Sequence, residues 1–428
     1  MTDGYTRRAL LGRAGSGLII AGAVETGAAA QSMAADQSTV RASAPGPRLL
    51  NVVALGADPT GQRDSAPALQ QAIDEIARTG GTVYIPAGRY RIGRTLLWQN
   101  PNNARAPGIT LQGDGMHSTV LVSAMEAGPI FKVRGVPAVG PINTTFFWGG
   151  GIRDLSFHGD GGRGDQHGLE ILGWYYGEIQ NCQFLGFGGD GIRALVDLDV
   201  YPNPDYTSST MLLRGVWFER LGGYGFRDMS RVQGAPSWSW SHCVFNMCRA
   251  GCALVRSGGL EFRKCTFTGA GWQDERGRPA ARAYGLYFDG AATTSAQNLV
   301  EGCEFDTNLT AHIGARFLTA SSFLDNRFIF NDLHRSGRLR PPIGVEIGSG
   351  DSDATVLGVQ FRQSFFRFDL PGDAIAFDFA NSANVRDIEI GGTVFTEPRG
   401  TNVTRYRGHD PAGQGAAFGY AIRDRPRE

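Results

Sequence analysis

Short segments in which apolar and polar residues alternate recur along the chain, and each of them ends in phenylalanine. The copies occupy residues 152–157, 179–184, 212–218, 240–245, 260–267, 299–305, 324–328 and 390–395. Alternation of this kind is the period of a β-strand. The spacing between copies varies, as it does in solenoids whose loops absorb insertions. Because no helical pattern separates the copies, the chain is not built from alternating strands and helices.

A second, shorter motif follows the phenylalanine in most copies and places a glycine turn before another apolar residue. It occurs at residues 167–170, 190–193, 224–227 and 284–287, with weaker copies at 312–314, 343–346 and 373–375. Each repeat thus reads as a strand, a glycine turn and a second strand. Coils of this kind bury one continuous core when they stack, each on its neighbour. The pattern predicts an all-β fold, a single-stranded right-handed parallel β-helix over residues 48–428.

One helix is predicted ahead of the repeats, over residues 65–78. Leu69, Ala72, Ile73 and Ile76 fall at helical spacing. Asp64 or Ser65 can cap its start, Pro67 suits its first turn, and Gly80–Gly81 ends it. We expect this helix to cover the open end of the stack, where strand edges would otherwise be exposed.

The amino terminus resembles an export signal of the twin-arginine type. Arg7 and Arg8 precede a short, glycine-diluted apolar run at residues 18–24, and Ala28–Ala30 form a small-residue cleavage site. This run is too short to span a membrane. We predict a signal peptide over residues 1–30, a flexible linker over 31–47, and a periplasmic or secreted protein without a membrane partner after cleavage.

The amino-acid composition argues against a nucleic-acid partner and against a zinc site. The 41 basic residues balance 41 acidic ones, which argues against a nucleic-acid partner. Cys182, Cys243, Cys265 and Cys303 each lie two residues before a phenylalanine, so they are expected to form a buried ladder. The six cysteines do not provide the second cysteine pair or the histidines of a zinc site. We therefore expect no cofactor.

The opening of the predicted β-helix resembles a known superfamily. The segments 51–58, 64–73, 81–90 and 109–115 are similar to the start of the pectate-lyase superfamily, within a match over about residues 49–122. That group includes polygalacturonase-like hydrolases, polysaccharide lyases, uronate epimerases and phage tailspike depolymerases. The resemblance implies the β-helix fold and a polysaccharide substrate. It does not choose a reaction, because one fold hosts many chemistries.

Stacked coils place equivalent residues in columns along the helix. The position before the glycine turn gives a first column of His167, Asp190, Tyr224, Tyr284 and His312, with Gly251 between the two tyrosines. Three residues further on, a second column contains Glu170, Arg193, Arg227 and Tyr287. These ionisable and aromatic residues are the candidate site. The alternative interpretation is a solvated surface with stacked aromatic rings.

The first functional hypothesis is a glycoside hydrolase, which needs two carboxylates. Asp190 is its first candidate, because its Gly-Asp-Gly-Ile setting resembles part of the catalytic strand of polygalacturonase-like enzymes. Glu170 or Asp228 is the candidate partner. Those enzymes also carry an Asp-Asp pair and a Gly-His-Gly motif, and this sequence has neither.

The second hypothesis is a metal-independent polysaccharide lyase that acts on uronates. His167, Tyr224 or Tyr284 would then remove a proton, and Arg193 or Arg227 would bind the uronate carboxylate. A calcium-dependent lyase needs a cluster of oxygen ligands. The tight aspartate pairs that could contribute to one are Asp197 with Asp199 and Asp351 with Asp353.

The third hypothesis is a β-helix that binds carbohydrate without cleaving it. Trp174 and Trp238 are candidate sugar-binding residues, because flat rings suit sugar faces. Tyr284 and His312 join Arg193 and Arg227 as candidate substrate-binding residues. Further candidate aromatics beside long insertions are Trp148, Tyr175, Tyr176, Tyr201, Tyr206, Trp240 and Trp272. Packing within loops is the alternative for each ring, and a homo-oligomer is compatible with the sequence.

The export prediction can be tested by changing both Arg7 and Arg8 to lysine. Because the twin-arginine route recognises the arginine pair, the variant should accumulate in the cytoplasm. Cell fractionation with immunoblotting measures this, with the unaltered chain as control. Unchanged export would remove the twin-arginine prediction while leaving a general secretory signal in place.

Overall fold

Strands in successive turns of the chain pair in parallel and in register, so that three ladders run along a right-handed parallel β-helix. The computed structural model describes residues 48–99, 106–135, 147–161, 164–195, 208–229, 236–271, 282–290, 295–331, 341–348, 354–369, 372–379, 385–397, 401–408 and 420–423. Residues 47–428 form one compact unit. The predicted signal and linker, together with Asp197, Asp199, Tyr201, Tyr206, Trp272, Asp351 and Asp353, lie outside the described residues.

The first ladder contains β1 (Leu49–Asn51), β2 (Gly81–Tyr84), β6 (Ile109–Gln112), β10 (Gly151–His158), β13 (Glu178–Leu185), β15 (Leu212–Arg214), β18 (Ser239–Ser241), β21 (Glu261–Arg263), β24 (Leu299–Glu301), β27 (Ser322–Leu324), β30 (Thr355–Arg362), β33 (Val385–Gly391) and β36 (Tyr420–Arg423). The second ladder contains β3 (Gly88–Ile92), β7 (Thr119–Ser123), the second halves of β10 and β13, β16 (Trp217–Leu221), β19 (Val244–Cys248), β22 (Thr266–Thr268), β25 (Glu304–Asp306), β28 (Arg327–Phe330), β31 (Phe365–Phe368) and β34 (Val394–Thr396).

The third ladder contains β4 (Leu96–Gln99), β8 (Ala127–Arg134), β11 (Asp165–Leu172), β14 (Ile192–Ala194), β17 (Tyr224–Asp228), β20 (Gly251–Val255), β23 (Tyr284–Asp289), β26 (Ala311–Thr319), β29 (Ile343–Ile347), β32 (Gly372–Phe379) and β35 (Thr401–Arg407). A small separate sheet consists of β5 (Ala106–Pro107), β9 (Phe147–Trp148) and β12 (Trp174–Tyr175). Because β35 pairs with β32 and β36 pairs with β33, the described residues after Pro398 continue the β-helix.

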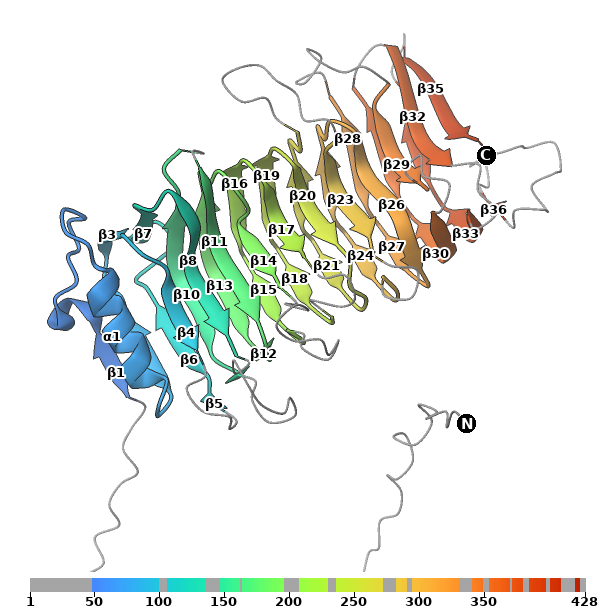
Figure 1. Cartoon of the computed structure of the whole chain (residues 1–428). Helices are drawn as coiled ribbons and strands as arrows, with labels where there is room; N and C mark the ends of the chain where they lie inside the picture. Colours follow the sequence, from blue (N-terminus) through green and yellow to red (C-terminus); the bar gives the residue numbers. More distant parts are fainter. Residues whose placement is uncertain are drawn as a thin grey trace, which may run out of the picture. The chain divides into compact units, whose positions relative to one another are not determined.

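The predicted capping helix is α1 (Ala66–Ile76), which lies at the β1 end of the stack (Figure 1). Its buried face includes Leu69, Ile73 and Ile76 and packs on β1, β2, β4 and the short 3-10 helix η1 (Val52–Leu55). Asp64 caps the start, because its Oδ1 accepts the backbone N–H of Ala66. The helix thus supplies apolar contacts to the first coil, as the sequence predicts. Within the described parts of the chain, no helix is long and apolar enough to cross a membrane.

The recurring phenylalanines form one stack through the core of the second ladder. Neighbouring rings lie 4.5 to 5.3 Å apart between centroids, and they are within 20° of parallel except in the last pair, which is tilted by 30°. The rings belong to Phe157, Phe184, Phe218, Phe245, Phe267, Phe305, Phe328, Phe366 and Phe395. The predicted cysteine ladder lies beside them, and all six cysteines are buried with free thiols. The apolar positions of the alternating pattern therefore face the core of each coil.

A single residue with left-handed backbone turns the chain between the first and second ladders in successive coils. These residues are Asp154, Asn181, Gly215, His242, Lys264, Gly302, Asp325, Gln363 and Gly392. Glycine, asparagine and aspartate tolerate this conformation better than other residues do. Asn181 also donates its side-chain amide to Asp154 Oδ1 at 3.1 Å, which links two neighbouring corners.

The phenylalanine stack can be tested with Phe218→Ala. Phe218 is 0% exposed and lies between the rings of Phe184 and Phe245. Removing the ring leaves a cavity, so the free energy of unfolding should fall by about 3–5 kcal/mol. Urea denaturation measures this. Leu212→Ala is the control, because Leu212 is 49% exposed and its loss should change stability by about 0.5 kcal/mol or less. Equal losses in the two variants would contradict the role of the stack.

Candidate functional site

The outer side of the third ladder carries charged residues in adjacent coils. Lys132, Glu170, Arg193 and Arg227 are successive register partners on β8, β11, β14 and β17. The distance between such neighbours is one strand spacing, about 4.8 Å. The predicted order Glu170, Arg193, Arg227 is confirmed by this register. We call these four residues the charged column.

The column continues beyond Arg227 with uncharged residues. Leu254 follows Arg227, and Tyr287 follows Leu254. The sequence predicts Tyr287 in this column, and the register confirms it.

The first predicted column is correct except at its far end. Tyr224 pairs with Gly251, as expected, but Tyr284 pairs with Ala311 rather than with His312. His312 is one position out of register and faces the core. There its ring packs 4.7 Å from that of Phe330 and its Nδ1 contacts the side-chain amide of Asn308 at 3.0 Å. His312 is therefore not on the outer surface.

Asp190 is the centre of a hydrogen-bonded network beside the charged column. Its side chain is 1% exposed. Its Oδ2 accepts from Arg193 Nε at 2.6 Å and lies 3.7 Å from Arg227 Nη1. Its Oδ1 accepts the backbone N–H of Tyr224 at 2.7 Å. Because both oxygens are engaged within the protein, Asp190 holds two guanidinium groups and the start of the next strand in place.

Glycines allow this close approach, and they explain the Gly-Asp-Gly motif. A side chain at residue 189 would overlap the ring of His167, and one at residue 191 would overlap the ring of Phe218. A side chain at residue 223 on the next coil would overlap the carboxylate of Asp190. Glycine at residues 189 and 191 is therefore required for the turn that carries Asp190 to pack against His167 and Phe218.

His167 is held in one tautomer. Its Nδ1 accepts the backbone N–H of Asp190 at 3.0 Å, so a neutral ring carries its proton on Nε2. Nε2 lies 3.3 Å from Asp165 Oδ1. Burial and the nearby Arg193 lower the pKa of His167, which favours the neutral ring at neutral pH. The ring thus presents an N–H donor to the Asp165 carboxylate.

Arg193 gathers three carboxylates from two coils. It contacts Asp190 at 2.6 Å, Asp165 at 3.7 Å and Glu170 at 3.9 Å, and Glu170 also contacts Lys132 Nζ at 3.0 Å. The side chain of Asp165 is 75% exposed, whereas those of Asp190 and Glu170 are largely covered. Asp165 is therefore the acid in this group that a ligand in solvent can reach.

Neither Asp165 nor Lys132 is among the site residues that the sequence predicts. Asp165 lies two residues before His167, and this short spacing was the available signal. Lys132 lies in β8, outside any motif, and only strand register places it beside Glu170.

Asp228 is placed away from this group although it follows Arg227 in the chain. It is buried, and its Oδ2 accepts from Ser257 Oγ at 2.6 Å and from the backbone N–H of Arg256 at 3.1 Å. Successive residues of a strand face opposite sides. Asp228 therefore holds a turn and does not join Asp190 on the outer side.

The two predicted sugar-binding tryptophans belong to the core. Trp174 and Trp238 are fully buried, and their indole N–H groups donate to the backbone oxygens of Gly149 and Ser208 at 2.8 Å. Their faces are covered in this structure, so neither ring can stack on a sugar.

The two predicted tyrosines lie in different surroundings. Tyr224 is half-buried with the Arg227 guanidinium 5.6 Å from its ring centre, and burial raises the pKa of its phenol. The Tyr284 hydroxyl donates to Glu346 Oε2 at 2.7 Å, and its ring stacks on Tyr287 at 4.5 Å. Burial and Glu346 raise the pKa of Tyr284. Both phenols therefore keep their protons at neutral pH. Among the described residues, no three His, Cys, Asp or Glu side chains are grouped to hold a metal ion.

Comparison with known proteins gives similar sequences and similar folds. The chain is 30% identical over 183 residues to the mannuronan C5-epimerase AlgE1 of Azotobacter vinelandii, a match over 42% of this chain and 11% of that protein. It is 32% identical over 179 residues to AlgE4 of the same organism, over 41% of this chain and 27% of that protein. The chain thus spans about a quarter or less of the length of these relatives.

Solved structures extend the likeness in fold over most of the chain. The A-module of AlgE4 superposes with a TM-score of 0.57 at 15% identity, covering 85% of this chain and 99% of the module. The ORF18 protein of Geobacillus virus E2 superposes with a TM-score of 0.58 at 17% identity, covering 83% and 61%.

The family model described as rhamnogalacturonase A/epimerase, pectate lyase-like, matches residues 49–272. This range contains the charged column, Asp165, His167 and Asp190. With the β-helix architecture, the match shows that the chain belongs to the rhamnogalacturonase A/epimerase family of pectate-lyase-like proteins.

Proposed function

We propose that this polysaccharide-active protein is an enzyme for acidic glycans, and that it works at the sugar carbon next to the uronate carboxylate. One observation carries the proposal. The exposed Asp165 carboxylate lies beside the N–H of His167 and within 3.7 Å of Arg193, which is one of the three cations of the charged column. An acceptor for a proton and cations for a carboxylate therefore occur at one place.

The cations suit a uronate ligand. Arg193 and Arg227 come from adjacent coils and both face Asp190, which fixes the directions of their guanidinium groups. A guanidinium binds a carboxylate through two parallel hydrogen bonds. A repeating acidic glycan laid across the coils would place its carboxylates near this row.

The proposed reaction begins with breakage of the C5–H bond. The proton passes to the Asp165 carboxylate, and the electron pair is delocalised onto the uronate carboxylate, where Arg193 and Arg227 stabilise the added charge. For epimerisation, water delivers a proton to the opposite face of C5, the electron pair returns to form the new C5–H bond, and Asp165 releases its proton to solvent. In β-elimination the electron pair instead forms the C4=C5 double bond as the C4–O bond breaks, and the departing oxygen takes a proton from Asp165 or from water, which leaves an unsaturated uronate. The relatives named above are called mannuronan C5-epimerases, and their reaction at C5 supports this chemistry.

Glycoside hydrolysis is the second candidate, favoured by the three carboxylates around Arg193. A hydrolase needs two carboxylates roughly 5 to 9.5 Å apart, one of them acting as a proton donor. Asp190 has both oxygens engaged and Glu170 is paired with Lys132, so Asp165 is left as the accessible acid. We therefore propose Asp190 as a positioning residue rather than as the acid of a hydrolase.

The proposed function predicts activity on polyuronates and none on a neutral glucan. Purified protein would be incubated in D2O with polymannuronate, polygalacturonate and a neutral glucan. Deuterium at C5 without chain shortening indicates an epimerase, and ultraviolet-absorbing unsaturated ends indicate a lyase. New reducing ends without unsaturation would overturn the C5 proposal in favour of hydrolysis. Polymer that is bound but chemically unchanged would indicate a binding protein.

Two substitutions separate the proposed acceptor from the proposed positioning residue. Asp165→Asn should lower kcat by at least ~10²-fold with unchanged stability, because the residue is exposed and would take the proton. Asp190→Asn should lower both activity and the free energy of unfolding, the latter by about 1–3 kcal/mol, because it removes a buried charge that faces two arginines. Asp373→Asn, on an exposed aspartate, is the control. Kinetics and urea denaturation measure these effects. Full activity of Asp165→Asn would exclude it as the acceptor.

A further inference from the structure

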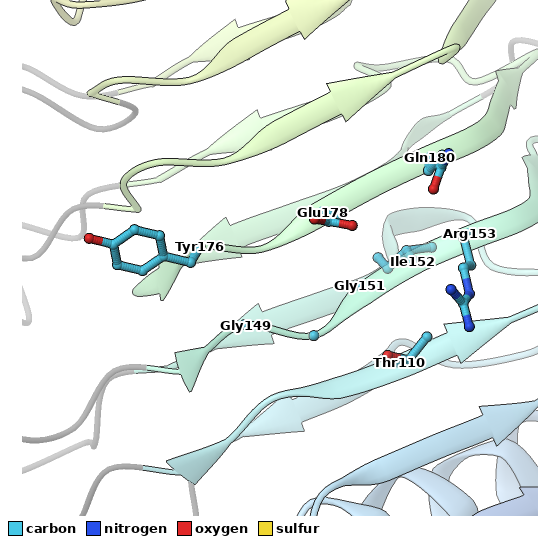
Figure 2. A pocket seen from close by; sticks show the side chains of 9 residues that line it. Thr110, Gly149, Gly151, Ile152, Arg153, Tyr176, Glu178 and Gln180 are labelled. Atoms are coloured by element: carbon cyan, nitrogen blue, oxygen red, sulfur yellow. The ribbon is translucent and has the colours of Figure 1, made fainter. Parts of the chain in front are cut away.

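A hollow of about 320 Å³ lies on the first ladder, apart from the charged column on the third. Its floor and walls come from β6, β10 and β13 and from the corner that precedes β13 (Figure 2). Small-molecule sites in proteins commonly have volumes of roughly 300 Å³ and above. The hollow is therefore large enough to be a binding site.

Absence of a side chain at Gly151 creates the hollow. Thr110, Gly151 and Glu178 are register partners in three successive coils. Thr110 and Glu178 project from the outer side, and between them Gly151 leaves a gap. Arg153 and Gln180 line the same hollow one alternation further along their strands, and Arg153 donates to Gln112 at 2.8 Å. Hydrogen-bond donors and acceptors thus surround the gap that is left where residue 151 has no side chain.

Tyr176 borders the hollow from the corner before the first ladder. From Gly149 onward the described coils each carry left-handed backbone at this corner, and the column contains Gly149, Tyr176, Thr210, Ser237, Gly259, Gln297, Ala320, Gly358 and Asp387. Within that described column, Tyr176 alone is aromatic. A bulky residue is unfavourable in left-handed backbone. The chain therefore places a large ring where its other coils have small or polar residues.

The ring of Tyr176 is presented to solvent on a rigid base. The residue is 55% exposed. Trp148 lies beneath it with ring centroids 5.4 Å apart, and Trp148 also stacks with Tyr175 at 5.5 Å. Figure 2 shows Tyr176 on the segment that leads into the strand with Glu178 and Gln180. A flat aromatic face with an array of hydrogen-bonding groups beside it matches the two surfaces of a sugar ring, which are apolar on the face and polar at the edge.

We propose that this hollow is an accessory, non-catalytic subsite that binds one sugar unit of a polysaccharide, with Tyr176 against the sugar face and Arg153, Glu178 and Gln180 at its hydroxyl or carboxylate groups. This inference rests on the proposed function in so far as that function supplies a polysaccharide ligand. Because the hollow and the charged column lie on different ladders, the subsite would hold a long chain and would leave the chemistry of a short one unchanged.

Direct binding measurements test the subsite without relying on turnover. Titration calorimetry with polymannuronate, polygalacturonate and a neutral glucan would be performed on wild type, Tyr176→Ala, Tyr176→Phe and Gly151→Leu. Tyr176→Ala removes the ring, and Gly151→Leu fills the gap without removing any group. Both should weaken binding of the preferred polymer by about 5- to 10-fold, which corresponds to the energy of one aromatic contact. Tyr176→Phe should bind as wild type.

Trp217→Ala is the matched control, because Trp217 is an aromatic residue 38% exposed on the second ladder. It should leave binding unchanged, and thermal denaturation should show that all four variants are folded. Wild-type affinity in both Tyr176→Ala and Gly151→Leu would overturn the subsite.

The outcomes also separate this inference from the proposed function. Weakened binding by Tyr176→Ala in a protein that turns over no polymer would support the subsite and remove the enzymatic proposal. Turnover of polyuronates with unchanged binding in the variants would do the reverse. Failure of every polymer to bind would overturn the subsite. For an active enzyme, kcat on short oligosaccharides should stay at the wild-type value in Tyr176→Ala.

Discussion

Parallel, in-register pairing between successive coils is the constraint on which the rest of this structure depends. It repeats one hydrogen-bonding pattern along three ladders, so that equivalent positions lie one strand spacing apart. Inward positions thereby become continuous stacks, such as the phenylalanine core. Outward positions become rows in which charges from distant parts of the sequence meet, as Lys132 meets Glu170 and Glu170 meets Arg193.

The candidate site combines a buried network of charged, hydrogen-bonded side chains with one exposed carboxylate, that of Asp165. Burying a carboxylate is costly unless charges and hydrogen bonds compensate it. Asp190 has this compensation from Arg193, Arg227 and the Tyr224 amide. The result is a fixed set of guanidinium groups and a fixed histidine tautomer beside Asp165. The proposed reaction would draw on this preorganisation, because fixed groups need not reorient as charge develops on a substrate.

Corner residues give the solenoid a second way to vary its surface. Left-handed residues recur at two corners of the described coils, one before the first ladder and one between the first and second ladders, and the residue type at each corner varies from coil to coil. At the corner between the first and second ladders, Asp154 and Asn181 link neighbouring coils through a hydrogen bond, whereas at the corner before the first ladder Tyr176 exposes a ring beside Trp148. A function can therefore be added at a corner without changing the core.

The repeats, the capping helix and the order Glu170, Arg193, Arg227 were determined by the sequence itself, because strand alternation and helical spacing are local and the Gly-turn motif marks equivalent positions. Tertiary structure decided the rest. Because loops of unequal length separate the coils, sequence spacing alone does not identify equivalent positions. Only the strand register shows that Lys132 lies in the column and that His312 does not. Burial of Trp174 and the inward direction of Asp228 likewise depend on which face each strand turns to the core, because a shift of one residue reverses that face.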